Sequence, residues 1–373
     1  MSPRNRLEQT LGIVLAGTHP WTRTAFDRLP PRPLLPIAHR PLLSYSLSWL
    51  RDGGVRDAAV CANRETQVLE SRLHRHVPHG LRVSYHEDTM PRGAAGAIRD
   101  AANQTNARLL VVTDGTSIPG LDLTELLAFH ETSGSAVTVV SHVEEGRHGK
   151  PALQVPTGTY VFNRTALAKV PERGFCDIKE NLIPQLHRAS EPVGVFAVAH
   201  PSPRVLDASS YRAVNEWMVD HLISTRTVPE GYVLSGSTLI HREAIVARDA
   251  TFVGPVLVGP GAQVCSGAVI VGPTSIGRDA IIGRDVLVSR SAIWRRSVLN
   301  DQVVADRCIL ADGSVINQAT RVFGEVMMMS RGELEIVREP ASVARETTPF
   351  ELLRRMGRAL FPNAAPTRFP AAQ

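Results

Sequence analysis

The sequence predicts two folded parts: an α/β domain with a mainly parallel sheet, followed by a parallel β-helix. Two observations support this fold class. In the first half, short apolar runs alternate with segments of helical periodicity, a pattern typical of parallel strands joined by crossover helices. In the second half, apolar residues recur at every sixth position, a period of neither a helix nor an ordinary strand. A length of 373 residues also suits two domains better than one.

The elements of the first half follow from its apolar spacing. Residues 11–17 form an apolar run ending in glycine, as a buried strand does. Residues 41–54 place leucines at helical spacing and stop at two glycines. Further strands are expected at 55–62, 81–88, 107–115 and 135–142, and further helices at 94–105 and 121–134. Parallel sheets bind ligands at the carboxyl ends of their strands, so the loops after residues 17, 86 and 112 form the candidate site.

The period of six in the second half predicts that one apolar side chain per repeat points into the interior of a coil. The nine residues of the unbroken run are Ile240, Val246, Phe252, Val258, Val264, Ile270, Ile276, Ile282 and Val288. Each buried Ile or Val contributes about 1.5–3 kcal/mol, and only stacked repeats can bury such a face. The register breaks at 289–297, which predicts a protruding loop. It resumes at Val298, Val304, Leu310, Ile316 and Val322.

Composition excludes several classes of protein. The net charge of +5 is mild and no run of Lys and Arg is present, so we expect no binding to nucleic acid. Four widely spaced cysteines are expected to be buried, reduced thiols. No apolar run approaches the length of a membrane span, and the first residues lack the apolar stretch of a signal peptide. Together these features favour a cytoplasmic location.

The expected domain boundaries follow the change of periodicity. The α/β domain is expected at 1–225, a linker at 226–236, the β-helix at 237–325 and a tail at 326–373. Within the tail, 348–361 begins with a capping box, Thr348 to Glu351, and predicts an amphipathic helix. Its apolar face needs a partner: the end of the β-helix, another protein or an anionic membrane surface. Covering the exposed interior of the last coil is the favoured choice.

An α/β domain followed by a hexapeptide β-helix resembles the nucleotidyltransferases that make sugar nucleotides. The likeness is greatest to mannose-1-phosphate guanylyltransferases and glucose-1-phosphate nucleotidyltransferases, over about residues 10–325. In that family LAAGxGTRLxPLTxxxPKPLLPV opens the domain, and here "PRPLLPIAHRPLLSYSLSWLRDGGV" matches its second half. The resemblance implies a Rossmann-like nucleotidyltransferase domain and a left-handed parallel β-helix. It also implies that a nucleoside triphosphate and a sugar 1-phosphate become a nucleotide sugar and pyrophosphate.

The phosphate loop departs from the family. Ala16 and Gly17 begin it as expected, but Thr18 and Pro20 stand where the family has glycines, and Trp21 stands where it has threonine. Glycines allow backbone N–H groups to approach phosphates, whereas Pro20 removes one N–H and Trp21 adds bulk. We therefore predict that residues 17–23 cannot wrap a triphosphate as the glycine-rich loops do.

The resemblance also assigns the charged residues of the loop. The catalytic arginine of the family falls at Thr22, or at Arg23 if the loop shifts by one residue. The family lysine becomes Arg32, which keeps the charge but not the shape; alternatively, Arg32 ends a surface loop.

Two further motifs carry the expected nucleotide and metal contacts. "MPRGAAGAIRDAA" resembles the family's LGTAGALRxA, so Gly93, Ala94 and Gly96 are expected at the base. Asp114 is the candidate for the first Mg²⁺ carboxylate, although its order with glycine is reversed; alternatively, it caps the following turn. Asp207, in a segment shorter than the family's DIGTPEDYLEAN, is the candidate for the second. An active enzyme would therefore use Mg²⁺, which prefers one or two carboxylates plus substrate phosphates.

The sugar side resembles the family in fewer residues. Lys150 and Gly158 match its sugar-phosphate segment, but about twenty residues that carry sugar contacts are missing. Asp177 in "CDIKENLIPQL" is expected either at the sugar or, as favoured here, as a helix N-cap.

Two function hypotheses remain. One is an active nucleotidyltransferase with Mg²⁺. The other is a degenerate relative, a pseudoenzyme that binds a nucleotide sugar or a protein and acts as a regulatory or scaffold subunit in polysaccharide biosynthesis. Relatives often associate through the β-helix, which implies a homo-oligomer.

Overall fold

The structure is a computed structural model that describes residues 7, 9–17, 29–63, 66–88, 90–144, 153–330 and 333–338. The chain divides into two compact units, Met1–Met218 and Val219–Gln373. Among the described residues, no helix has the length and apolar character that crossing a membrane requires. All four cysteines lie in the described part, and no disulfide joins them; three are buried and Cys265 is half-buried.

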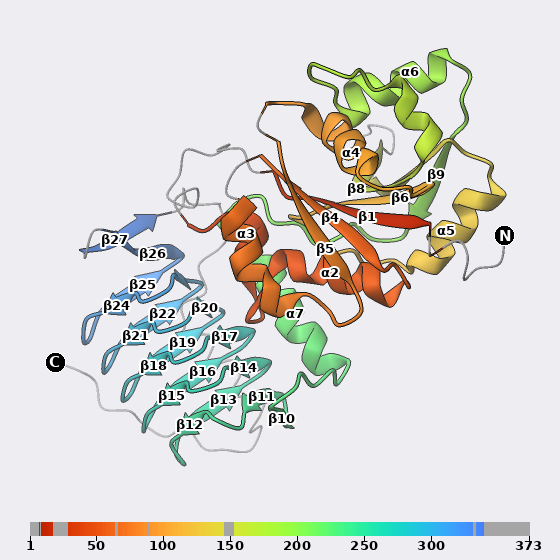
Figure 1. The fold of residues 1–373 in the computed structure, drawn as a ribbon. Helices are drawn as coiled ribbons and strands as arrows, with labels where there is room; N and C mark the ends of the chain where they lie inside the picture. The colour runs from red at the N-terminus through yellow and green to blue at the C-terminus, as the bar shows by residue number, and fades with distance from the viewer. Residues whose placement is uncertain are drawn as a thin grey trace. The chain divides into compact units, whose positions relative to one another are not determined.

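The first unit is built on one seven-stranded sheet (Figure 1). Its strands are β1 (Thr10–Leu15), β4 (Asp57–Ala62), β5 (Arg82–Glu87), β6 (Leu109–Asp114), β7 (Val137–Glu144), β8 (Leu153–Asn163) and β9 (Val193–Val198). They lie in the order β5-β4-β1-β6-β8-β7-β9. Only β8 runs antiparallel to its neighbours, so the predicted mainly parallel α/β sheet is confirmed.

Helices cover both faces of this sheet. They are α2 (Leu42–Asp52), α3 (Thr66–Leu73), α4 (Gly93–Asn103), α5 (Leu123–Thr132), α6 (Ile183–Arg188) and α7 (Ala208–Ser224), with short turns η2 (Arg32–Leu34), η3 (His74–His76), η5 (Arg164–Lys169) and η6 (Ile178–Leu182). A small hairpin pairs β2 (Pro36–Ile37) with β3 (Arg40–Pro41). Leucines of α2, α3 and α5 form one core, and α4 packs with η6 and α6 in the other. Both cores hold the strands of the central sheet in place.

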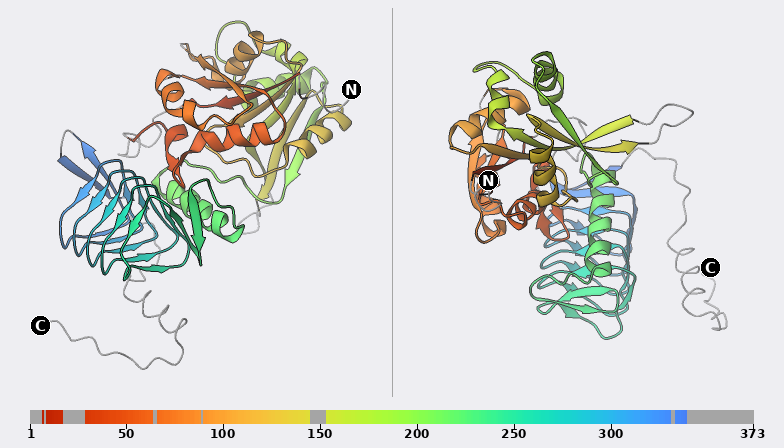
Figure 2. Two further views of the ribbon diagram at one scale, coloured as in Figure 1. Left: turned by 60° about the horizontal axis from the view of Figure 1, so that its bottom comes forward. Right: turned by 90° about the vertical axis from the view of Figure 1, so that its right-hand side faces the viewer.

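The second unit is a stack of short parallel strands in three sheets (Figures 1 and 2). The first sheet contains β10 (Tyr232–Ser235), β11 (Thr238–His241), β14 (Val256–Val258), β17 (Thr274–Ile276), β20 (Ala292–Ile293), β23 (Ile309–Leu310), β26 (Glu325–Ser330) and β27 (Glu333–Arg338). The second contains β12 (Ile245–Val246), β15 (Gln263–Val264), β18 (Ile281–Ile282), β21 (Val298–Leu299) and β24 (Val315–Ile316). The third contains β13 (Thr251–Val253), β16 (Val269–Val271), β19 (Leu287–Ser289), β22 (Val304–Asp306) and β25 (Arg321–Phe323).

The chain passes through the three sheets in turn, which is the path of a β-helix. All nine residues of the predicted run, 240 to 288, belong to or pack against one internal core, so the predicted inward face is confirmed. At the far end, β27 pairs antiparallel with β26, and Leu334 packs against the same core.

The predicted protruding loop at 289–297 is wrong. Val258 pairs with Ile276, eighteen residues on, whereas Ile276 pairs with Ile293, only seventeen residues on. The corner after β19 is therefore one residue shorter, and the coil continues without an insertion. Arg290 takes a positive φ of 44° there, and the hydroxyl of Ser291 donates a hydrogen bond to the Ser289 carbonyl (2.7 Å).

Because the corner is shorter, two of the predicted inward positions are wrong by one residue. Leu299 and Ala305 are fully buried in the coil interior, whereas the predicted Val298 and Val304 are half-buried one position away. The predictions for Leu310, Ile316 and Val322 are confirmed. A break in the sequence period thus marks a tighter corner, and the coils that follow are seventeen rather than eighteen residues long, as the pairing of Ile293 with Leu310 shows.

The expected linker differs from the structure in one respect. Residues 232–235 form β10, which pairs antiparallel with β11, and all of 226–236 lies within the second unit. The two units divide between Met218 and Val219, within α7. Residues 339–373 lie outside the described part, and with them the expected tail helix 348–361.

Candidate functional site

The carboxyl ends of β1, β4 and β6 lie side by side. Leu15 is in register with Cys61 on one side and Asp114 on the other. Beyond Leu15 the chain stays attached to the sheet, because the Ala16 N–H donates a hydrogen bond to the Cys61 carbonyl (2.7 Å). Ala16 is buried and Gly17 is exposed. The start of the phosphate loop and Asp114 are therefore at one edge of the sheet, where parallel sheets bind ligands.

Asp114 is the last residue of β6, and its carboxylate is already engaged. One oxygen, Oδ1, accepts hydrogen bonds from the Thr116 N–H (2.8 Å) and the Thr116 hydroxyl (2.7 Å). The other, Oδ2, forms an ion pair with Nη2 of Arg204 (2.5 Å). Asp114 thus caps the turn that follows β6, one of its two expected roles, and it also binds a guanidinium that sequence reasoning did not foresee.

The backbone fixes Arg204 beside Asp114. Residues around Arg204 run antiparallel to those around Ser117. The Ile118 N–H donates to the Pro203 carbonyl (2.9 Å), and the Val205 N–H donates to the Thr116 carbonyl (2.8 Å). Nothing in the spacing of the sequence signals this contact, because ninety residues separate the two partners. Only the pairing of the two segments brings them together.

Asp207 caps the start of α7. Its Oδ1 accepts hydrogen bonds from the Ser210 N–H (2.8 Å), the Ser210 hydroxyl (2.7 Å) and the Ser209 hydroxyl (2.9 Å). Partial burial alone would raise the pKa of Asp207. The hydrogen bonds from Ser210 and Ser209, together with the positive charge of Arg32, outweigh burial and lower the pKa below its ordinary value.

The structure therefore brings Arg32 close enough to Asp207 for their charges to interact. The helix that starts at Asp207 is attached to the segment after Arg32: the Tyr211 hydroxyl donates to the Pro36 carbonyl (2.6 Å), and the Ala38 N–H donates to Asn215 Oδ1 (2.9 Å). These bonds place two expected site residues that are far apart in the chain, Arg32 and Asp207, at one location.

The arrangement does not fit the Mg²⁺ ion that the resemblance implies. Both oxygens of Asp114 have partners, and one partner is itself a cation. Asp207 uses Oδ1 as a helix cap. Within the described residues, no group of three or more His, Cys, Asp or Glu is placed to hold a metal ion. A divalent cation at Asp114 would have to approach the Arg204 guanidinium against like-charge repulsion.

Two of the expected glycines occupy positions that other residues would not fit. Gly93, at the start of α4, has φ +72°, and a Cβ there would lie 2.5 Å from the Cys176 carbonyl oxygen. Gly158 has φ +91°, and a Cβ there would lie 3.2 Å from the Cβ of Asp114. Gly158 on β8 is therefore packed against the acidic residue of β6. Ala94 is half-buried and Gly96 is buried on α4.

Asp177 is an N-cap, as favoured from the sequence. Its side chain accepts hydrogen bonds from the N–H groups of Lys179 (2.7 Å) and Glu180 (3.1 Å) at the start of η6. The charges of Asp177 and Asp114 both affect the pKa of the buried Tyr160 phenol. Burial, then the charges of Asp177 and Asp114, raise the pKa of Tyr160, and Arg204 partly opposes them. Asp114, Asp177 and Arg204 thus lie around one buried tyrosine.

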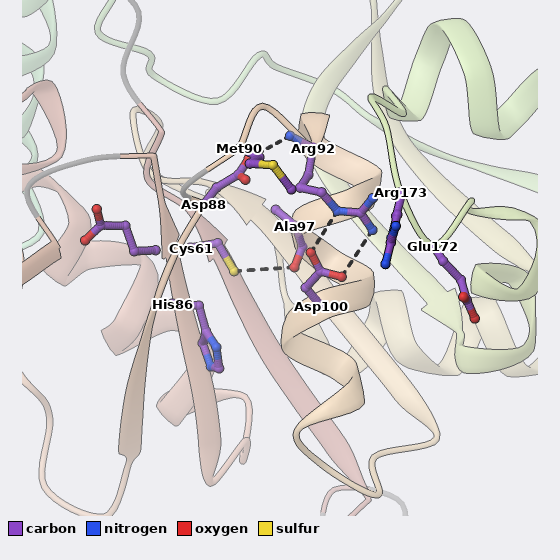
Figure 3. A pocket seen from close by; sticks show the side chains of 10 residues that line it. Cys61, His86, Asp88, Met90, Arg92, Ala97, Asp100, Glu172 and Arg173 are labelled. Carbon is purple, nitrogen blue, oxygen red and sulfur yellow. Dashed lines mark hydrogen bonds and ion pairs between the residues drawn. The ribbon is translucent and has the colours of Figure 1, made fainter.

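A cavity of about 330 Å³ lies beside the start of α4 (Figure 3). Sequence reasoning missed its main anchor, Arg92. The Arg92 guanidinium pairs with Asp100 (Nε to Oδ2, 3.0 Å) and donates to the carbonyls of Gly174 (3.1 Å) and Pro171 (3.2 Å). Burial, and then the charges of Asp100 and Asp88, raise the pKa of the Cys61 thiol in the cavity to about 12. That thiol therefore stays protonated and is not a nucleophile.

Arg92 also affects the expected nucleotide motif at the start of α4. Its bonds hold the segment 171–174 against α4, and the Ala95 N–H then donates to the Cys176 carbonyl (3.0 Å). The turn at Gly93 is thereby fixed. None of Gly93, Ala94 and Gly96 lines the cavity.

Comparison with known proteins shows what the two parts of the chain are similar to. Residues 24–151 match the family model "Nucleotidyl transferase", and residues 252–346 match "GMPPB C-terminal domain". A mannose-1-phosphate guanylyltransferase of Mycobacterium tuberculosis is 25% identical over 295 residues, which cover 74% of this chain and 77% of that protein. The chain thus carries a nucleotidyl transferase domain followed by a GMPPB-type C-terminal domain.

The similar proteins do not all share one base and one sugar. A probable mannose-1-phosphate guanylyltransferase 1 of Oryza sativa is 24% identical and covers 68% of this chain and 75% of its own length. A UTP–glucose-1-phosphate uridylyltransferase of Synechocystis is 22% identical over 68% of this chain and 75% of its own. Two expected site residues of the nucleotidyltransferase domain, Arg23 and Lys150, lie outside the described residues, as does most of the loop 17–23.

Proposed function

We propose that the first domain binds a nucleotide sugar or nucleoside triphosphate and that its nucleotidyl transfer is weak or lost. The chain then serves as a regulatory or scaffold subunit in polysaccharide biosynthesis. The observation that carries this proposal is the engagement of Asp114 by Arg204. Loss of one preorganised charge-stabilising contact typically costs about 3–4 kcal/mol of transition-state stabilisation. The replaced glycines of the loop, with Pro20 and Trp21, act in the same direction.

The proposed binding roles follow the carboxyl edge of the sheet. Ala16, Gly17, Gly93, Ala94 and Gly96 are assigned to the nucleotide. Arg23 and Arg32 are assigned to its phosphates, since guanidinium groups bind phosphate in a bidentate manner. Lys150, Gly158 and Asp177 are assigned to the sugar phosphate. A cytoplasmic location and self-association through the β-helix complete the proposal.

A second candidate is an active enzyme that converts a nucleoside triphosphate and a sugar 1-phosphate into a nucleotide sugar and pyrophosphate. The nearness of Arg32 and Asp207 favours it, because a cation and a carboxylate occur where the family resemblance assigns both. In that case Asp207→Ala abolishes pyrophosphate release. Unchanged turnover of the variant would remove Asp207 from the reaction.

Pyrophosphate release separates the two candidates. The purified chain is incubated with each of the four nucleoside triphosphates, with mannose or glucose 1-phosphate and with Mg²⁺, and the M. tuberculosis relative serves as the positive control. Our proposal expects no release above the rate without protein, while titration calorimetry detects binding of a nucleotide sugar. Turnover comparable to that of the relative would contradict the proposal and establish the second candidate.

A further inference from the structure

Arg204 holds a position that a metal ion would need. Its Nη2 is 2.5 Å from Oδ2 of Asp114, at the edge of the sheet where a ligand would lie. Two backbone hydrogen bonds from Ile118 and Val205 hold the segment of Arg204 in register with the turn after β6. The guanidinium is therefore placed by the fold and is not merely an exposed side chain that meets a nearby carboxylate.

The guanidinium also has donors to spare. Within the described residues, Nη2 is the atom of Arg204 that forms its ion pair, and 43% of the side chain is exposed. An arginine carries five N–H donors in a planar fork that matches the oxygens of a phosphate. One arm of Arg204 thus faces Asp114, and its remaining N–H groups form no hydrogen bond to the residues that the structure describes.

The positive charge of Arg204 opposes the negative charges of nearby carboxylates. Asp114 and Asp177 both act on the phenol of Tyr160, and Arg204 opposes them. Arg204 is therefore a positive charge in a region that also holds the charges of Asp114 and Asp177.

We propose that Arg204 takes the place of a divalent cation beside Asp114, so that this site binds the phosphate groups of its ligand without metal. The phosphate part of this inference rests on the proposed function, namely that the site binds a nucleotide or nucleotide sugar. The exclusion of the cation rests on the geometry of Asp114 and Arg204 alone. The two parts therefore need separate measurements.

The first measurement is binding of Mn²⁺ alone, followed by electron paramagnetic resonance of the free ion. We expect Arg204→Gln to bind one Mn²⁺ at least about tenfold more tightly than the wild type, because a like charge close to the ion is removed. Arg204→Lys retains that charge and is expected to behave as the wild type. The double variant Asp114→Asn/Arg204→Gln is expected to lose the gain.

A matched control comes from the β-helix. Arg295 and Asp312 form an ion pair of the same length, 2.5 Å, and Arg295 is 49% exposed. Arg295→Gln uncovers a single carboxylate, so we expect no comparable gain in Mn²⁺ binding. An equal gain there, or no gain in Arg204→Gln, overturns the exclusion of the cation. If Arg204→Gln does not fold, as judged by circular dichroism, Arg204→Met carries the same expectation.

The second measurement is titration with inorganic pyrophosphate in EDTA. The wild type is expected to bind, and Arg204→Gln is expected to bind at least about tenfold more weakly, since a charge-assisted contact is lost. Equal binding by the two proteins, or no binding by the wild type, overturns the phosphate part. Failure of nucleotide sugars to bind would instead refute the proposed function, while the Mn²⁺ result would still stand.

Discussion

Individual residues decide both what this site retains and what it has changed. Gly93 and Gly158 keep positive φ values that favour glycine, and a Cβ at Gly93 would clash with the Cys176 carbonyl oxygen. Asp114 lies at the end of β6 as expected, but its carboxylate forms an ion pair with Arg204. The residue types expected from the sequence are thus present, and the change in chemistry comes from a partner that is distant along the chain.

The role of Gly93 is tested by a pair of glycine variants. Gly93→Ala would have both a positive φ and a Cβ 2.5 Å from a carbonyl oxygen, whereas Gly80→Ala has a φ of +86° and open space. We expect Gly80→Ala to lower the free energy of unfolding by about 1–2 kcal/mol, and Gly93→Ala to lower it by more. Urea denaturation measures both. Equal losses would show that the contact between Gly93 and Cys176 does not constrain the turn.

The cap at Asp207 predicts a pH-dependent contribution to stability. The pKa of Asp207 is lowered in the folded protein, so its stabilisation is present above the unfolded pKa of about 4 and is lost as the pH falls through the folded value. At pH 7 we expect Asp207→Ala to cost about 1 kcal/mol. The difference from the wild type should narrow below about pH 4 in urea denaturation. A difference that stays constant from pH 7 to pH 3 would exclude the ionised cap.

At the scale of elements, the sequence predicted what periodicity encodes. Five strands (β1, β4, β5, β6 and β7) and three helices (α2, α4 and α5) of the first unit follow from local spacing alone, and so does the inward row from Ile240 to Val288. The shape of the corner after β19 does not follow from local spacing. An inserted loop and a turn that is one residue shorter both break a six-residue period, so the sequence alone does not distinguish them. The pairing of Ile276 with Ile293 resolves it.

The corrected register gives a direct prediction. Leu299 is fully buried in the coil, and its neighbour Val298 is half-buried. We expect Leu299→Ala to lower the free energy of unfolding by about 2–5 kcal/mol. Val298→Ala should cost less than about 1 kcal/mol. If thermal or urea denaturation gave the reverse order, the inward position would be Val298 and the corner would be misassigned.

At the scale of the whole molecule, the sequence predicted the fold of the two units better than it predicted the candidate site. The α/β fold and the β-helix could be predicted from the sequence, and so could the resemblance of the first part to nucleotidyl transferases. The candidate site was predicted only in part. Asp114, Asp207 and Arg32 were found by motif, whereas Arg204 and Arg92 act through contacts with segments far along the chain, which no local pattern encodes.

The tail remains a prediction, because 339–373 lies outside the described residues. Its expected apolar face would cover the end of the β-helix, where Leu334 already packs against the core. We expect deletion of 346–373 to lower the melting temperature and to increase binding of an apolar dye. An unchanged melting temperature together with lost co-sedimentation with anionic liposomes would support the membrane surface instead.

The central claim is that Arg204 replaces a metal ion in ligand binding. Titration calorimetry of the wild type with GDP-mannose, once in EDTA and once in Mg²⁺, tests it most directly. The account predicts affinities that agree within about twofold, because the guanidinium is always present and needs no added cation. Binding that is seen only in Mg²⁺ would contradict it.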